Sequence, residues 1–230
     1  MTTRSIACTL LVGLVPFFIG CSSEKKTPAA ANSWSGRTYF LDIPASHWKQ
    51  PSGIGKDIGP SVPKFLLSIS GSEVLVGTAG ADGAQDMCGP TSIFTATSPY
   101  PDIQIGPANA RVRIGDEANT IPVIATAYNF TMTNILSETP DASGPQGSFS
   151  AVIDAREVYS VFYQLADPTA DSVCRALESI SPCTPCPQDQ ANYCLALKAV
   201  ALAAGPLTGP GVQPVEEANL AASCALDGGS

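Results

Sequence analysis

The stretch KFLLSISGSEVLVGT, residues 64–78, predicts a β-hairpin. Its two arms, residues 64–70 and 73–78, are rich in the branched and aromatic side chains that favour strands. Gly71-Ser72 between them is a two-residue link of the kind that closes a tight antiparallel turn. We therefore expect antiparallel strand pairing to organise this part of the chain.

Other segments on both sides of the hairpin share its strand character. They are residues 37–43, 103–105, 111–114, 119–136 and 147–154. Turn-forming stretches separate them, in keeping with the 20 glycines and 20 prolines of the 230-residue chain. About seven short strands with turns between them predict a mainly β fold, either an antiparallel β-sandwich or an open barrel.

The longest of these segments, residues 119–136, changes its apolar face part-way along. Ala125 and Ala127 stand at odd positions, whereas Phe130 and Met132 stand at even positions. Because side chains alternate between the two faces of a strand, a change of parity needs an extra residue or a change of sheet. The sequence therefore predicts a β-bulge here, or a strand that crosses between two packed surfaces.

Beyond residue 154 the apolar period lengthens to that of a helix. One short helix is predicted at residues 158–165, and a second with Asp167 as N-cap and Pro168 as its first residue. The spacing also predicts a third helix at residues 188–204, and a last helical turn at residues 216–222 follows it. We therefore expect a β-rich domain at residues 34–154. A cysteine-bearing helical region at residues 155–230 would pack on it as a small disulfide-bonded appendage.

The first 20 residues have the features of an export signal, because Arg4 precedes an apolar run that is too short to span a bilayer comfortably. The run ends in Phe18-Ile19-Gly20-Cys21, which resembles the lipobox of bacterial lipoproteins, although Phe18 stands where Leu is usual. The alternatives are a secretory signal with a free cysteine and an uncleaved transmembrane helix. Residues 21–33 then predict a flexible tether.

The resemblance implies cleavage before Cys21 and a diacylglycerol thioether on its sulfur, with a further acyl chain such as palmitate on its amino group. Several acyl chains anchor a protein stably where one would be marginal. Ser22 is not the aspartate that tends to retain lipoproteins at the inner membrane. The expected location is therefore the cell envelope. The outer membrane is favoured, with the domain facing the periplasm or the cell surface.

Six cysteines remain once Cys8 in the signal and Cys21 are set aside, namely Cys88, Cys174, Cys183, Cys186, Cys194 and Cys224. An even number in an exported chain predicts three disulfides, because the compartments outside the cytoplasm are oxidising. The sequence does not choose among the many pairings. We expect at least one bond to join two of the predicted helices. By elimination, Cys88 with Cys224 would then fasten the C-terminus to the β-rich domain.

The cysteine cadence Cys174…Cys183-Thr-Pro-Cys186…Cys194 is similar to that of a group of lipoproteins of unknown function from myxobacterial-type genomes. The segment SFSAVIDAR, residues 148–156, is similar as well. The resemblance covers much of the chain after Cys21 and implies no activity.

The same cysteines have two alternative interpretations. Cys183-Thr-Pro-Cys186 has the form of a thiol–disulfide exchange motif, and together with Cys174 and Cys194 it has the ligand count of a zinc site. Export to an oxidising compartment argues against free thiolates, and no parallel-sheet pattern precedes the motif. Structural disulfides are therefore favoured.

Catalytic and nucleic-acid-binding signatures are missing from the sequence. The net charge is −8, and Lys25-Lys26 is the only basic cluster after the signal, which argues against a nucleic-acid partner. His47 is the only histidine, and the sequence contains no G-x-S-x-G elbow, H-E-x-x-H motif or P-loop. We therefore predict no catalytic residue, no cofactor and no metal. The protein or small-molecule ligand is left open.

Acidic and aromatic residues give weaker signals. Two acidic pairs could supply oxygen ligands to calcium but lack the spacing of a calcium loop, and they are Asp82 with Asp86 and Asp116 with Glu117. Four aromatic side chains could line a binding face, although packing is favoured for each, and they are Trp34, Tyr39, Trp48 and Tyr100.

Three classes of function follow. The leading hypothesis is a membrane-anchored exported lipoprotein with a structural or binding role. The alternative is a carbohydrate-active or other hydrolase, since the two carboxylates of such an enzyme are set by the fold and leave no motif. A redox or metal protein is the third class.

Overall fold

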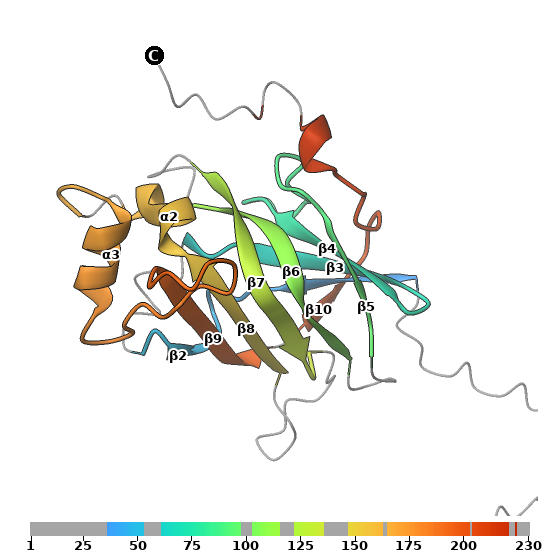
Figure 1. The fold of residues 1–230 in the computed structure, drawn as a ribbon. Coiled ribbons are helices and arrows are strands. Elements are labelled where there is room, and N and C mark those ends of the chain that lie inside the picture. The colour runs from blue at the N-terminus through green and yellow to red at the C-terminus, as the bar shows by residue number, and fades with distance from the viewer. Residues whose placement is uncertain are drawn as a thin grey trace, which may run out of the picture. The chain divides into compact units, whose positions relative to one another are not determined.

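The structure is a computed structural model and describes residues 36–52, 61–97, 103–115, 122–135, 147–162, 165–202, 204–220 and 224. The described residues belong to one compact unit, Trp34–Ser230. The unit is mainly β, as predicted, and its strands form two antiparallel sheets of five strands each (Figure 1). No helix in these described ranges is both long enough and apolar enough to cross a lipid bilayer.

The first sheet is organised around the predicted hairpin. Its strand order is β10-β1-β3-β4-β5, and the strands are β1 (Arg37–Leu41), β3 (Lys64–Ser70), β4 (Glu73–Ala79), β5 (Ser92–Thr95) and β10 (Ala204–Leu207). Ser70 stands opposite Glu73, so that Gly71 and Ser72 alone make the turn. Gly71 has a φ of +63°, a conformation that glycine adopts without steric cost. The hairpin prediction is therefore confirmed.

The second sheet holds the longer strands. Its order is β2-β9-β8-β7-β6, and the strands are β2 (His47–Gln50), β6 (Gln104–Ile114), β7 (Val123–Thr133), β8 (Gly147–Asp154) and β9 (Cys194–Leu202). The two short strands predicted at residues 103–105 and 111–114 belong, apart from Ile103, to the single strand β6. The strand predicted at residues 147–154 matches β8, with Phe149, Ala151 and Ile153 buried on one face.

The change of parity in β7 is a β-bulge, the first of the two predicted alternatives. The pairing of β7 with β8 shifts between Tyr128 and Thr131, and Asn129 between them has a φ of +51°. Beside it, β6 has its own irregularity at Gly106, whose φ is +78°. A side chain on Gly106 would overlap the carbonyl oxygen of Phe130, so the two irregular segments fit together only because residue 106 is glycine.

One hydrophobic core is shared by the two sheets. Phe65 of β3 and Phe94 of β5 face Phe130 of β7 and Phe149 of β8. The ring centre of Phe130 lies 5.7 Å from that of Phe65, 5.2 Å from that of Phe94 and 5.6 Å from that of Phe149. Aromatic rings at such spacings attract each other beyond the area that they bury. This group of rings therefore joins the two sheets at the middle of the core.

The described helices are short and all follow β8. They are α2 (Ala155–Val158), the 3-10 turn η2 (Tyr159–Val161), α3 (Ala170–Leu177) and the 3-10 turn η3 (Glu217–Asn219). The predicted start of the second helix is wrong by two residues. Thr169 and not Asp167 caps α3, because the Thr169 hydroxyl accepts a hydrogen bond from the Ser172 amide while the Ser172 hydroxyl accepts one from the Thr169 amide.

The helix predicted at residues 188–204 is wrong, because Cys194–Leu202 form β9 and Ala204 begins β10. Leu195, Leu197 and Ala199 are buried at alternate positions against β8. The run is rich in Leu and Ala, which favour helices when isolated, and burial between β2 and β8 overrides that preference. The segment after residue 154 therefore contributes a strand to each sheet.

The three disulfides are Cys88–Cys224, Cys174–Cys183 and Cys186–Cys194. They pair all six predicted cysteines, and Cys88 with Cys224 is the pair reached by elimination. The expectation that a disulfide joins two helices is wrong. Cys174–Cys183 joins α3 to the following loop, and Cys186–Cys194 joins that loop to β9, because the expected third helix is a strand.

Candidate binding cavity

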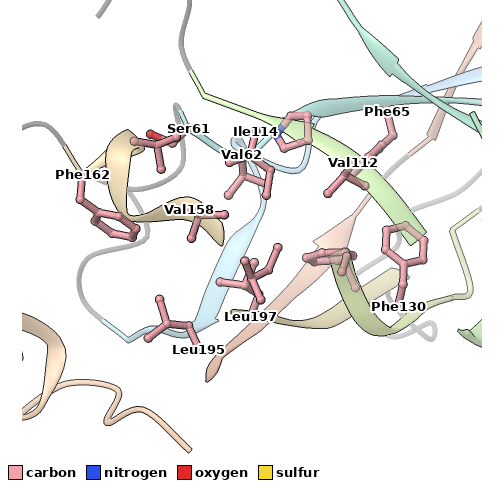
Figure 2. A pocket seen from close by; sticks show the side chains of 15 residues that line it. Ser61, Val62, Phe65, Val112, Ile114, Phe130, Val158, Phe162, Leu195 and Leu197 are labelled. Atoms are coloured by element: carbon pink, nitrogen blue, oxygen red, sulfur yellow. The ribbon is translucent and has the colours of Figure 1, made fainter. Parts of the chain in front are cut away.

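An apolar cavity of about 60 Å³ lies in the core beside α2 (Figure 2). Both sheets contribute to its wall. Phe65 comes from the first sheet, and Val112, Phe130 and Leu197 come from three strands of the second. Of the 15 side chains around it, only that of Ser61 is polar.

The space exists where one strand presents a small side chain. Ala127 of β7 is buried and faces the cavity with a single methyl group, while its neighbours around the wall carry larger side chains. Up to Ala127 the buried side chains of β7 stand at odd positions. After the bulge at Asn129 they stand at even positions, beginning with Phe130. The bulge therefore places a bulky ring at one end of the cavity and leaves the small residue at its side.

The segment that follows β8 closes one side of the cavity. Val158 at the end of α2, Val161 of η2 and then Phe162 line this side. Figure 2 shows Val158 and Phe162 on the same side of the cavity as Ser61 and Val62. We call residues 155–162 the lid segment.

The start of the lid segment is fixed by a buried carboxylate. Asp154, only 2% exposed, accepts a hydrogen bond from the Arg156 amide at 2.9 Å and thereby caps α2. Its other oxygen accepts from the Arg156 guanidinium at 2.6 Å and from the Gln188 side chain at 2.7 Å. A buried carboxylate with this many donors is satisfied and holds its neighbours in place.

A second attachment fixes the lid segment to β7 and β6. The Glu157 carboxylate accepts a hydrogen bond of 2.7 Å from the Thr126 amide, and the Arg111 guanidinium lies 3.5 Å from it. Arg111 also donates to both oxygens of Glu217 at 2.8 Å, which raises the pKa of Arg111 and lowers the pKa of the Glu217 carboxyl. The lid segment is thus tied on its outer side by charged groups, while its inner side is apolar.

The chemistry of the cavity is that of an apolar container. Its wall carries no titratable side chain, and its single hydroxyl belongs to Ser61. Apolar cavities in proteins stay dry and bind small apolar molecules, as an engineered cavity of about 150 Å³ binds benzene. A cavity of about 60 Å³ accommodates a smaller apolar group, such as the end of an alkyl chain.

The predicted lipid attachment lies outside the described residues, as do the signal at residues 1–20 and the tether at residues 21–33. The cysteines of the alternative zinc and redox sites are all described. Cys183 is bonded to Cys174 and Cys186 to Cys194, so the two cysteines of the C-x-x-C motif are not bonded to each other. Asp154 lies near Cys186 and Cys194, but both sulfurs are committed to a disulfide.

The other candidate residues are dispersed. His47 is exposed on β2, an outer strand of the second sheet. Asp82 accepts a hydrogen bond from the Ala84 amide, whereas Asp86 forms an ion pair of 2.7 Å with Arg113. Tyr39 is buried in the core, and Trp48 is partly buried and packs against the same core. The remaining candidates lie outside the described residues, namely Trp34, Tyr100, Asp116 and Glu117.

Sequence reasoning did not predict the cavity. Phe130, Phe149 and Ala127 could each be assigned to a buried face from their alternation along a strand. A void, however, depends on which side chains meet from elements far apart in the sequence, here β3, β6 and the lid segment. No family model matches the chain, and neither a curated protein nor a solved structure matches it.

Proposed function

We propose that the protein is an exported lipoprotein, anchored to a membrane of the cell envelope through lipid on Cys21, and that its β-rich domain has a binding role. The Phe18-Ile19-Gly20-Cys21 ending of the apolar run supports the anchor. Three disulfides in one domain support export, because such bonds persist in oxidising compartments. The outer membrane is the favoured location.

In this proposal, the ligand places one of its apolar groups in the cavity. The observation that carries it is the almost wholly apolar wall around about 60 Å³. Interiors are usually packed to the density of organic crystals, so a void of this size leaves its lining without contacts that a bound group would restore. An alkyl chain end would gain these contacts without any polar partner.

We propose further that the two sheets pack face to face as a sandwich or an open barrel. Two contacts between β5 and β6 support closure along one side, the bridge between Ala96 and Ile105 and the 2.9 Å hydrogen bond from the Thr97 amide to Gln104. The region around α3 has a small apolar cluster of its own that includes Val173 and Leu177. In this proposal the region is a disulfide-bonded appendage of the domain.

Lipid attachment is tested by mass spectrometry of the protein purified from membranes. The expected result is an N-terminal peptide that begins at Cys21 and carries the mass of acyl chains. The variant Cys21→Ser should lose both the acyl mass and the membrane association. Unchanged fractionation of this variant with membranes would contradict the anchor.

Binding in the cavity is tested with xenon, a small apolar probe, by following methyl resonances of the protein during a xenon titration. Saturable shifts are expected at Val112 and Val158, which line the cavity. The variant Ala127→Val fills the space and should abolish them. Ala196→Val is the matched control, because Ala196 is half-buried on β9 and does not line the cavity. Equal xenon shifts in both variants would refute the proposal.

The hydrolase hypothesis stays a prediction. Two acidic residues at the lid segment already have partners, Asp154 with Arg156 and Glu157 with the Thr126 amide. Neither lines the cavity. Nothing in the described residues favours a hydrolytic site over a binding site.

A further inference from the structure

Residues 211–217, here called the C-terminal strap, lie across the outer side of the first sheet and reach β6. The strap has no partner strand along its length. It is held instead by Gln85 and Thr91 of the loop that joins β4 to β5 and by Arg111 of β6. Figure 1 shows this segment running beside the first sheet towards the last 3-10 turn, η3.

Two side chains recognise the strap's backbone. The Gln85 side-chain amide donates to the Gln213 carbonyl at 2.8 Å and accepts from the Gln213 amide at 2.7 Å, so that it pairs with the residue as a neighbouring strand would. Thr91 binds the backbone of Val215 in the same two-way manner. Its amide donates to the Val215 carbonyl at 2.8 Å, and its hydroxyl accepts from the Val215 amide at 3.2 Å.

Shape and charge fix the register of the strap. Val212 is buried on Gly77 of β4, where a Cβ atom would come within 3.1 Å of the valine. Gly211 lies against Ser68 of β3, where a Cβ atom would come within 2.9 Å of the hydroxyl. At the other end, Glu217 forms its two hydrogen bonds with Arg111. We call the surface that holds the strap the groove, and its residues are Ser68, Gly77, Gln85, Thr91 and Arg111. The groove contacts a small residue, a valine and an acidic side chain at fixed spacing.

The groove buries little of the strap. Most strap residues are exposed, and Val212 is the only one that is buried. The segment between β10 and the strap, residues 208–210, is exposed and contains Gly209 and Pro210. Segments with few buried contacts open at low free energy. The Cys88–Cys224 disulfide adds a covalent constraint that keeps the strap on its own copy.

We propose that the groove is a docking site for this type of segment, and that opening of Cys88–Cys224 lets the strap of a second copy occupy it. A dithiol would open the bond. One of its thiolates attacks the Cys224 sulfur, which breaks the S–S bond and releases Cys88 as a thiolate that takes up a proton. The second thiol then closes the dithiol's own disulfide and releases Cys224 as a thiol. Two electrons pass from the dithiol to the protein. Exchange of an identical element between copies is an established route to dimers.

The test mixes two full-length variants that cannot close the bond within one copy. Cys88→Ser retains Cys224 on the strap side, and Cys224→Ser retains Cys88 beside the groove. After mixing under mild oxidation, exchange should produce a covalent heterodimer linked through Cys88 and Cys224. It should form at least about fivefold faster than the homodimer of either variant alone, because docking raises the local concentration of the two thiols.

The strap's acidic contact supplies the specificity control. Glu217→Gln in the Cys224→Ser chain should speed heterodimer formation about fivefold, because it weakens the hold of the resident strap while the incoming strap keeps its ion pair with Arg111. Glu216→Gln is the matched control, since the Glu216 carboxylate accepts a hydrogen bond from the side chain of Asn219, its near neighbour in sequence. Equal rates for the two, or a heterodimer no faster than the homodimers, would overturn the proposal.

A second measurement applies if the single-cysteine variants do not fold. The unaltered protein is reduced with dithiothreitol and reoxidised at low and at high protein concentration. An intermolecular Cys88–Cys224 bond whose yield rises with concentration supports strap exchange. A product that stays monomeric at every concentration contradicts it.

Discussion

Filling the cavity should stabilise the protein, whereas the same substitution two residues away should destabilise it. Ala127 and Ala125 are both buried alanines on the same face of β7, but only Ala127 lines the cavity. Replacement by valine adds two methyl groups and the same strand preference at each position. The difference between Ala127→Val and Ala125→Val therefore isolates the effect of the void.

The magnitudes follow from the cavity's size. A void in a core destabilises by about 24 cal/mol per Å³, so the roughly 60 Å³ here corresponds to about 1.4 kcal/mol. Burial of two methyl groups gives a similar value, about 1.6 kcal/mol. Ala127→Val should therefore gain about 1 kcal/mol or slightly more. Ala125→Val has no void to enter, and overpacking should cost about 1–3 kcal/mol.

Equilibrium unfolding in urea with the disulfides intact measures both changes. The two variants should differ by about 2–4 kcal/mol in the free energy of unfolding, with unchanged m-values. In a domain of this size each kcal/mol moves the melting temperature by about 2–4 °C. Equal losses of stability in both variants would refute the reasoning, because the space beside Ala127 would then not be available to a side chain.

Two further predictions concern the bulge and the strap. Gly106→Ala should destabilise by at least about 3 kcal/mol, because the added methyl group meets the Phe130 carbonyl. Gly71→Ala, also at positive φ but with open space around the new methyl group, should cost only about 1–2 kcal/mol in the same urea assay, and equal losses would contradict this reason. The strap should loosen in acid, because the pKa of Glu217 is lowered by Arg111 and the stability it contributes is lost as the pH falls below the ordinary glutamate range, through the lowered folded value. The amide resonances of the strap should follow this titration, and Glu217→Gln should remove it.

The parts of the fold that sequence predicts are those that local alternation determines. The hairpin at Gly71-Ser72 follows from turn chemistry within a few residues. The change of parity in residues 119–136 narrows that segment to a bulge or a crossing between packed surfaces, and the structure has the bulge. β9 does not follow from local alternation, because Leu195, Leu197 and Ala199 fit a strand while the spacing from Cys194 to Leu197 and Ala201 fits a helix. Only the position of β9 between β8 and β2 decides between them.

The candidate sites show the same division. The outward direction of Arg111 and Arg113 follows from their alternation with Val112, yet their partners Glu217 and Asp86 are distant in sequence. The pair Cys88 and Cys224 could be reached by elimination, since the other four cysteines lie close together in the chain. The cavity could not be predicted, because a void depends on the sizes of side chains that pack together from distant parts of the sequence.

The late position of β9 and β10 in the chain has a consequence for the timing of folding. β9 inserts between β2 and β8, and β10 completes the edge of the first sheet beside β1. Ribosomes deliver the chain from its N-terminus. Until residue 202 has been made, β8 and β2 lack their common neighbour, and until residue 207 has been made, β1 has one unpaired edge. A nascent chain of this protein therefore remains incomplete, with open strand edges, for nearly the whole of its synthesis.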